Sequence, residues 1–428
     1  MLNDLYDYIQ QTPLIDTHEH LASEDENIHN GPDVLRELFE FYGVSDLRSA
    51  GASLEAVTRV LDSKDTDVEA RWNGVKDAWE HCKFTGYGEA TRLLAKHLYQ
   101  IDEITLDAII AASELNQQYR QAGQRLHLLK TVANLDHVQI DDFTWACQPD
   151  PAGVDFFLYD LSWVNFCRGQ IEAEQLLETT GIQVKDLATL RTAMEALFAK
   201  YGHQAIAVKT QHAYNRTLKW ESPDLHITEA SLQKELHGDA LTVDERLMLG
   251  NWGWEQGLQL AEEYNLPFKI HTGYLAGNDK YTDPDGVRSI HFAPLFLKYP
   301  NVKFVLMHTA YPWTSENLTL AKHFPNVYLD MCWAWSINPF HSTQFIRQAI
   351  HSVPLNKIFL FGGDTLWASG TVAYAIQARN GLYDALSQEI SSGYLTEQQA
   401  IHIASRFMHA NQKDCFDIEG TRAVLKES

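Results

Sequence analysis

Short apolar runs alternate with longer amphipathic runs over most of this chain. The first apolar run lies within 13–20, and the alternation after it predicts repeated pairs of a strand and a helix. Such pairs are typical of a parallel sheet covered by helices, because each strand needs a crossover before the next can run in the same direction. Seven further strands are expected at 136–141, 156–163, 205–209, 267–271, 303–308, 326–331 and 357–362.

Helices are expected between these strands, where apolar residues recur at three- and four-residue steps. A terminal helical section is expected at 371–415, within which Thr396 has the sequence context of a helix cap. The helices between the strands are expected at 187–201, 242–264, 292–298, 317–323 and 342–351.

A longer helical stretch separates the first strand from the second. Residues 21–124 show helical periodicity, as in Val34, Leu35, Leu38 and Phe39, and contain no convincing strand. We interpret this stretch as a helical insertion.

Eight strands with interleaved helices favour a closed (β/α)₈ TIM barrel over an open doubly wound sheet. The length of 428 residues suits one large barrel that carries insertions. The sequence therefore predicts an α/β protein that forms a single (β/α)₈ barrel domain over 1–428, with the helical insertion at 21–124 after its first strand.

Composition restricts the partners of the protein. The chain carries 34 Lys and Arg against 57 Asp and Glu, and its net charge of −23 would repel nucleic acid and anionic lipid. Its five cysteines are scattered and form no C-x-x-C pair, which argues against a disulfide framework and a thiolate zinc knuckle. The acidic amino terminus and the lack of a long apolar run favour a cytoplasmic protein without membrane or nucleic acid partners, and leave a homo-oligomer open.

His18 and His20 lie at the polar end of the first strand. Side chains of a strand alternate between its two faces, so both imidazoles point the same way. Two neutral imidazoles at the carboxyl end of a barrel strand suit a divalent metal, although a polar strand end that faces solvent has the same pattern. The interpretation of this motif as a metal site therefore requires further ligands elsewhere in the chain.

Three other strands end in residues that bind metals. The expected fifth strand ends in His271, the sixth in His308, and the eighth is followed by Asp364. The carboxyl ends of the strands form one ring in a barrel, so these side chains are expected to converge with His18 and His20. Nitrogen ligands with one carboxylate favour Zn²⁺, with Mn²⁺, Fe²⁺ or Co²⁺ as alternatives. Asp364 is suited both to bind the metal and to accept a proton from the activated water.

This ordered set of residues resembles the amidohydrolase superfamily, and most closely its amidohydrolase 2 branch of metal-dependent hydrolases, decarboxylases and uronate isomerase. The resemblance covers nearly the whole chain. It implies that His18, His20, His271 and Asp364 hold the metal and that His308 polarises or protonates the substrate.

Two further segments support this placement. Residues 42–51, which include Arg48, look like the corresponding stretch of uronate isomerase and of the amidohydrolase-like domain of FluG proteins. Lys209, with Tyr214 and Arg216 after it, is similar to a segment of the FluG-like group. Superfamily members with two metals carbamylate a lysine on strand four, but the branch that this chain resembles usually keeps one metal. We therefore interpret Lys209 as a contact to a substrate anion, joined by Tyr214, Arg216 and Arg48.

The chain lacks the phosphate-binding loop, the dinucleotide-binding glycine pattern, the serine-nucleophile elbow and the H-E-x-x-H helix. The leading hypothesis is a hydrolase that opens a small carboxylate-bearing amide or lactone with a metal-activated water, with Asp364 as base and His308 as electrophile. A metal-dependent decarboxylase and a uronate-type sugar-acid isomerase are alternatives within the same fold. A non-catalytic metal- or ligand-binding module is the alternative from another class.

Overall fold

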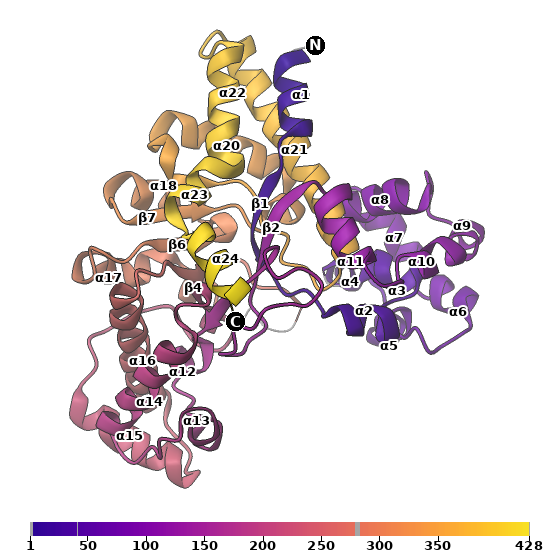
Figure 1. The fold of residues 1–428 in the computed structure, drawn as a ribbon. Helices are drawn as coiled ribbons and strands as arrows, with labels where there is room; N and C mark the ends of the chain where they lie inside the picture. Colours follow the sequence, from indigo (N-terminus) through magenta and orange to yellow (C-terminus); the bar gives the residue numbers. More distant parts are fainter. Residues whose placement is uncertain (1–2, 41, 279–282, 428) are drawn as a thin grey trace.

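A computed structural model describes residues 3–40, 42–278 and 283–427 of the chain. Eight parallel strands follow one another around the sheet in sequence order, which confirms the predicted (β/α)₈ barrel (Figure 1). The strands are β1 Leu14–Glu19, β2 Leu135–Ile140, β3 Phe157–Ser162, β4 Ala205–Thr210, β5 Phe268–His271, β6 Phe304–Met307, β7 Val327–Asp330 and β8 Ile358–Phe359.

All eight strands lie where the apolar runs predict them, and most of their ends agree to within two residues. β8 differs most, because its regular part has only two residues. Its continuation nevertheless closes the barrel onto the first strand. The N–H of Thr17 donates to the carbonyl of Phe361 at 3.1 Å, and the N–H of Asp364 donates to the carbonyl of His18 at 2.9 Å. The closure therefore brings the residues around His18 and Asp364 into direct contact.

Helices surround the barrel and connect its strands. The predicted helices are all present, and Thr242 and Thr396 each begin one with a capping box. The helices after β2 are α12 Val164–Arg168, α13 Ala173–Thr180, α14 Leu187–Tyr201, α15 Leu225–His237, α16 Val243–Glu263, α17 Ala293–Lys298, α18 Thr314–His323, α19 Ala334–Ile337, α20 Pro339–Ser352, α21 Ala368–Ser391, α22 Glu397–Ser405, α23 Asn411–Cys415 and α24 Ile418–Glu427.

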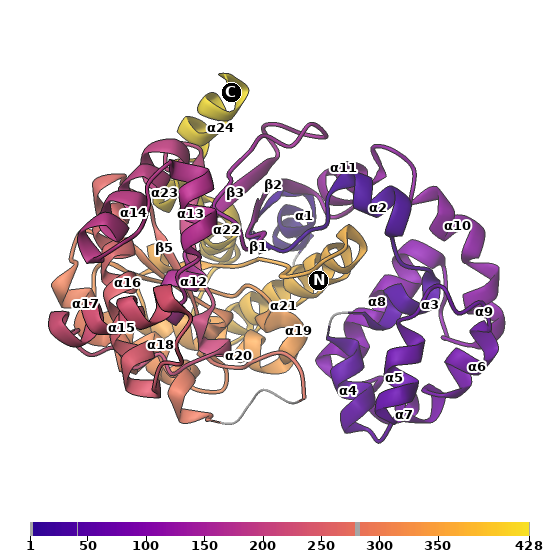
Figure 2. The same cartoon turned by 90° about the horizontal axis from the view of Figure 1, so that it is seen from below.

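A group of short helices stands to one side of the barrel, and these helices lie between β1 and β2 in the chain (Figure 2). We call residues 24–127 the β1–β2 segment. Its helices, after the separate α1 Asn3–Gln11, are α2 Glu24–Asn30, α3 Val34–Phe39, α4 Gly43–Ser49, α5 Leu54–Val60, α6 Val68–Asn73, α7 Lys76–Cys82, α8 Gly86–Tyr99, α9 Leu106–Ala111, α10 Ser113–Gln118 and α11 Gln124–His127. The division of the chain into domains stays a prediction.

The β1–β2 segment meets the barrel where α8 packs on α21. Gln377 of α21 donates through its amide to the carbonyl of Gly86 at 3.0 Å and to the carboxylate of Glu89 at 3.0 Å. A Cβ atom at position 86 would overlap the carbonyl of Ser336, so only glycine permits this close approach. The contact fixes the position of the segment above the carboxyl ends of the strands.

Charged residues occupy the middle of the barrel. Lys269 of β5 and Asp160 of β3 are fully buried and form an ion pair, with Nζ–Oδ distances of 2.8 and 2.9 Å. The same ammonium donates to the carbonyl of Thr17 at 2.7 Å, which ties β5 to β1. An apolar layer that includes Phe359 and Phe416 lies beside this pair, with the Phe416 ring centroid 5.3 Å from Nζ. Three strands are therefore linked directly beneath the ring of histidines.

Replacing Lys269 with Met should destabilise the protein strongly. Asp160 would be left as a buried carboxylate without its cation, and a broken buried pair typically costs about 3–5 kcal/mol of unfolding free energy. The double variant Lys269→Met/Asp160→Leu should regain most of this loss, because it removes both charges. Urea denaturation measures the unfolding free energy.

Lys83→Met is the matched control, because Lys83 pairs with Glu80 at the surface. It should change the unfolding free energy by less than about 1 kcal/mol. Equal effects at positions 269 and 83 would contradict the assignment of a structural ion pair.

Candidate functional site

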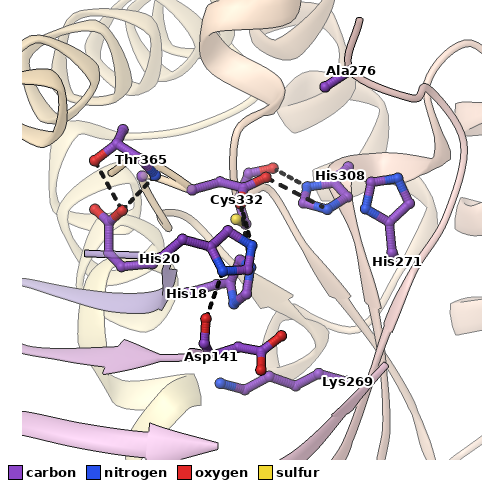
Figure 3. A network of polar contacts seen from close by, with 12 residues as sticks. His18, His20, Asp141, Lys269, His271, Ala276, His308, Cys332 and Thr365 are labelled. Atoms are coloured by element: carbon purple, nitrogen blue, oxygen red, sulfur yellow. Dashed lines mark hydrogen bonds and ion pairs between the residues drawn. The ribbon is translucent and has the colours of Figure 1, made fainter. Parts of the chain in front are cut away.

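Three electron-rich atoms meet at the junction of β1 and β8. The Nε2 atom of His18 lies 3.2 Å from Nε2 of His20 and 3.2 Å from Oδ1 of Asp364, and His20 Nε2 lies 3.3 Å from the same oxygen. Ligands placed tetrahedrally around a metal at about 2.0–2.1 Å would be separated by about 3.4 Å. The three atoms therefore have the spacing of three ligands to one ion. Figure 3 shows the rings of His18 and His20 close together at this site.

The sequence around β1 and β8 holds these atoms in place. Asp364 adopts a left-handed backbone conformation with φ of +58°, which turns its side chain toward β1. The buried carboxylate of Glu19 accepts hydrogen bonds from the N–H of Thr365 at 2.6 Å and the hydroxyl of Thr371 at 2.7 Å. A Cβ atom at Gly363 would overlap this carboxylate. Glu19 therefore fixes the loop that presents Asp364.

The orientation of the His20 ring is set by its surroundings. Its Nδ1 atom lies 2.5 Å from the carbonyl oxygen of Asp141, which can only accept, so Nδ1 donates and Nε2 is the ring atom that faces Asp364. The two imidazole nitrogens and the carboxylate need a shared positive centre, either a proton or a metal ion, and their spacing fits a divalent metal.

The electrostatics keep the ligands in their metal-binding states. Burial lowers the pKa of His18 well below its usual value, and the charge of Lys209 adds to this effect. Burial acts to raise the pKa of Asp364, but the hydrogen bond from His18 and the charges of the nearby histidines hold it well below its usual value. Near neutral pH His18 is therefore neutral and Asp364 ionised, as metal ligation requires.

His308 faces the same site from β6. Its Nδ1 donates to the carbonyl of Cys332 at 2.9 Å, and its Nε2, which has no hydrogen-bond partner among the described residues, lies 3.9 Å from Oδ2 of Asp364. Burial lowers the pKa of His308 to about 4. The imidazole is therefore neutral and directs a lone pair toward the second carboxylate oxygen of Asp364.

His271 lies beside His308, with the ring centroids 4.3 Å apart. Its Nε2 donates to the carbonyl of Tyr274 at 2.9 Å, so only Nδ1 can serve as a ligand atom. The described residues form two possible donor groups, His18, His20 and Asp364 and also His308, Cys332 and Asp364, and neither includes His271. The structure places His271 on the wall of the pocket, and its predicted role as a fourth ligand stays a prediction.

The site opens into a pocket of about 980 Å³ at the carboxyl ends of the strands. This volume is at the upper end of the range for small-molecule sites. Its lining combines metal-site residues, residues that follow β2 to β5, and residues of the β1–β2 segment. They are His18, His20, Glu40, Tyr42, Val44, Leu61, Asp141, Asp142, Phe143, Arg168, Lys209, Gln211, Tyr214, Asn215, His271, Ala276, Asp364 and Leu366.

Lys209 lines this pocket, as expected for a residue that contacts a substrate. Its side chain is buried, with 1% of its surface exposed, and its ammonium forms no hydrogen bond or ion pair with any described residue. Tyr214 also lines the pocket, where its hydroxyl accepts from the N–H of Ala276 at 3.0 Å and its ring lies 4.8 Å from His271. A buried cation without a partner is costly, so Lys209 is placed to receive an anionic or carbonyl group.

Two predicted substrate contacts do not line the pocket, and their role stays a prediction. Arg48 is exposed and donates to the carbonyl of Ala52 at 2.8 Å. Arg216 is half-buried, and its guanidinium donates to the carbonyl of Cys167 at 3.1 Å and to the amide oxygen of Asn251 at 2.6 Å. The sequence does not determine the direction of an arginine side chain in a loop, and here both guanidinium groups donate hydrogen bonds to backbone carbonyls.

Two residues that line the pocket were not predicted as site residues from the sequence. Gln211 follows β4, is 5% exposed, and neither amide atom has a hydrogen-bond partner among the described residues. Arg168 at the end of α12 is half-buried, and its Nε likewise lacks a partner there. Burial lowers the pKa of Arg168, although the group remains a cation. Lys209, Gln211 and Arg168 therefore place three polar groups without strong hydrogen-bond partners from the described residues on the β3–β4 side of the pocket.

Comparisons with known proteins concern the family and the fold of the chain. Residues 231–398 match a protein-family model for amidohydrolases. The FluG protein of Emericella nidulans is 27% identical over 184 residues, which are 40% of this chain and 20% of that protein. The matched part thus spans about a fifth of the length of this relative.

Two solved structures resemble the chain over nearly its whole length. Uronate isomerase from Thermotoga maritima has a TM-score of 0.79 and 16% identity, and the match covers 97% of both chains. Glucuronate isomerase from Caulobacter crescentus has a TM-score of 0.78 and 17% identity, and the match covers 98% of this chain and 94% of that one. At these identities the likeness shows a shared fold.

Removing a ligand of the three-atom group should remove the metal. We expect His18→Asn, His20→Asn and Asp364→Asn each to weaken metal binding by at least about tenfold, since even residues that only support ligands contribute 10- to 100-fold. Metal content per chain and titration calorimetry of the metal-free protein measure the effect.

His29→Asn is the matched control, because the side chain of His29 is 66% exposed and lies outside the site. It should bind metal as the unchanged protein does. If His18→Asn and Asp364→Asn also kept full metal affinity, the three-atom group would not be the metal site.

Proposed function

We propose that the chain is a member of the amidohydrolase superfamily and a metal-dependent hydrolase of a small amide or lactone that carries a carboxylate. Zn²⁺ is the proposed metal, because two imidazoles and one carboxylate are ligands that it prefers. Mn²⁺ and Fe²⁺ are compatible with the same ligands. No helix in the described part of the chain is long and apolar enough to cross a membrane.

One observation carries the proposal: the ligand group is incomplete. Among the described residues two groups of three possible donor atoms share Asp364, one with His18 and His20 and one with His308 and Cys332, and the pocket opens onto the first group. Structural zinc sites are closed by four protein ligands, whereas catalytic sites keep a position for water or substrate. This geometry therefore favours an enzyme over a non-catalytic binding module.

A metal bound by His18, His20 and Asp364 supplies a Lewis acid and lowers the pKa of water to about 7. Asp364 then has two tasks, because Oδ1 faces the histidines while Oδ2 points toward His308. Oδ2 is free to take the proton of the attacking water. His308, with its unpartnered Nε2, receives that proton from Asp364 or hydrogen-bonds to the reacting group once protonated.

The opposite side of the pocket supports a carboxylate on the substrate. Lys209 and Arg168 both line it and have donors without partners among the described residues. Hydrogen bonds from cations to carboxylates are roughly twice as strong as neutral ones. An anionic substrate would therefore be held by these two groups and oriented with its scissile bond toward the metal.

Sugar-acid isomerisation is the second candidate, and the same two proton-carrying groups support it. Asp364 Oδ2 and His308 Nε2 are 3.9 Å apart and could move a proton between adjacent carbons. Two isomerases share the fold over nearly the whole chain. Decarboxylation would use the same groups to protonate a carbanion.

His308→Gln should separate chemistry from metal binding. The variant should keep its metal, while kcat for a hydrolysed substrate falls about 10²- to 10⁴-fold, the usual contribution of a positioned proton-transfer group. The measurement is a screen of the metal-loaded protein against N-acyl amino acids and carboxylated lactones, with hexuronates included. Turnover of hexuronates alone would exclude the hydrolase and support the isomerase.

Lys209→Met should weaken substrate use without loss of metal. Removing one charged hydrogen-bond partner costs about 1.5–3 kcal/mol, so kcat/KM should fall roughly 10- to 150-fold. Lys219→Met is the control, because Lys219 is exposed and pairs with Glu221 at the surface. An unchanged kcat/KM in Lys209→Met would mean that Lys209 does not contact the substrate.

A further inference from the structure

The pocket has two chemically different sides, and each side comes from different elements. The polar side consists of Lys209 near the end of β4 and of Arg168, Gln211 and Asn215 in the segments that follow β3 and β4. The apolar side comes from the β1–β2 segment and the loop after β8. Its members are Val44, Leu61 and Leu366.

These two sides lie across the barrel from each other. The strands follow one another in order around the barrel, so β4 is opposite β8. The β1–β2 segment extends from β1, which is the neighbour of β8 at the closure. The three apolar side chains are each half-buried, so their remaining surface faces the pocket. A ligand that spans the pocket would therefore meet cations at one end and apolar side chains at the other.

Two polar side chains of the β1–β2 segment that line the pocket, Glu40 and Tyr42, already have partners within the protein. The carboxylate of Glu40 accepts from the guanidinium of Arg36 at 2.6 Å and from the indole N–H of Trp367 at 2.7 Å. The hydroxyl of Tyr42 donates to the carbonyl of Asp364 at 2.9 Å. Hydroxyl groups of a ligand placed here would lose water and gain few hydrogen bonds, which is unfavourable.

An aromatic ring extends the apolar side over the metal ligands. Phe143 stacks on His20 with centroids 4.6 Å apart and planes within 6°. It is 52% exposed and has a positive φ of 63°, a conformation that a phenylalanine rarely adopts. Strained backbone conformations of this kind cluster at active sites and ligand-binding sites, where the surrounding structure maintains them. Here it presents a ring face to the pocket.

We propose that the substrate is a carboxylate whose remaining part is an aliphatic or aryl group, not a polyhydroxylated sugar acid. The carboxylate binds Lys209 and Arg168, and the apolar part packs on Val44, Leu61 and Leu366. This inference rests on the proposed function for the orientation of the substrate, and it names the substrate class that the proposed function leaves open.

Equilibrium binding of non-reacting carboxylates tests the inference without turnover. The zinc-loaded protein is titrated with 3-phenylpropanoate and with D-gluconate, and calorimetry gives each dissociation constant. We expect 3-phenylpropanoate to bind at least about tenfold more tightly, since burying several apolar carbons outweighs hydroxyl groups that lack partners. Tighter binding of D-gluconate would overturn the inference.

Variants locate the contact. Leu61→Asn and Leu366→Asn should each weaken 3-phenylpropanoate binding about tenfold and reduce the preference over D-gluconate, because each replaces a pocket-lining apolar group by an amide. Leu54→Asn is the matched control: Leu54 begins the same helix that Leu61 ends, is 66% exposed, and does not line the pocket. Loss of binding in Leu54→Asn equal to that in Leu61→Asn would overturn the assignment of the contact.

Lys209→Met separates this inference from the proposed function. It should weaken both carboxylates alike, because it acts on the end that they share. If neither carboxylate binds to the zinc-loaded protein, both the anion contact of the proposed function and the substrate class fail. If both bind and D-gluconate is preferred, only the substrate class fails and the isomerase is favoured.

Discussion

The three electron-rich atoms at the β1–β8 junction are the feature on which the rest of the site depends. Two imidazole nitrogens and a carboxylate oxygen lie within 3.3 Å of one another, which is the spacing of three ligands around one cation. The fold must hold the three atoms at this spacing. It does so by closing the barrel, because the strand that carries His18 and the loop that carries Asp364 bind each other through main-chain hydrogen bonds. Barrel closure therefore sets the spacing of the ligand atoms, on which the metal affinity depends.

The interior beneath these atoms is built to support charge. Lys269 pairs with Asp160, and Lys209 lies unpaired nearer the pocket, so two cations face several buried carboxylates. Burial raises the pKa of Asp16 to about 7 and that of Asp330 to about 7, and each carboxyl accepts main-chain or side-chain hydrogen bonds from the strands around it. The cost of burying charge is offset by pairing, which also fixes the strands in position. A polar barrel interior is thus a rigid support for the ligands rather than a defect of the core.

The sequence predicted the barrel because strand and helix periods are local, and it predicted that His18, His20, His271, His308 and Asp364 converge because the position at a strand end determines where a side chain points. In loops the direction of a side chain does not follow from the sequence. Arg48 and Arg216 were predicted as substrate contacts, but in the structure both donate to backbone carbonyls and neither lines the pocket. Gln211 gave no signal, because a glutamine is unremarkable until its amide is found buried without a partner. Short elements such as α12 and α13 carry too few residues for a period to be recognised.

The separation of the pocket into a cationic side and an apolar side also bears on the reaction. A proton shuttle between neighbouring carbons of a sugar needs hydrogen-bond partners along the sugar chain, whereas attack of water on one carbonyl needs only that the carbonyl be held at the metal. The described site concentrates its proton-carrying groups, Asp364 Oδ2 and His308 Nε2, at one point beside the ligands. The proposed anion contacts lie across the barrel and the proposed apolar contacts above the ligand atoms, so in the proposal both position one bond. The proposed hydrolysis is compatible with this distribution of groups, in a fold that also hosts isomerases.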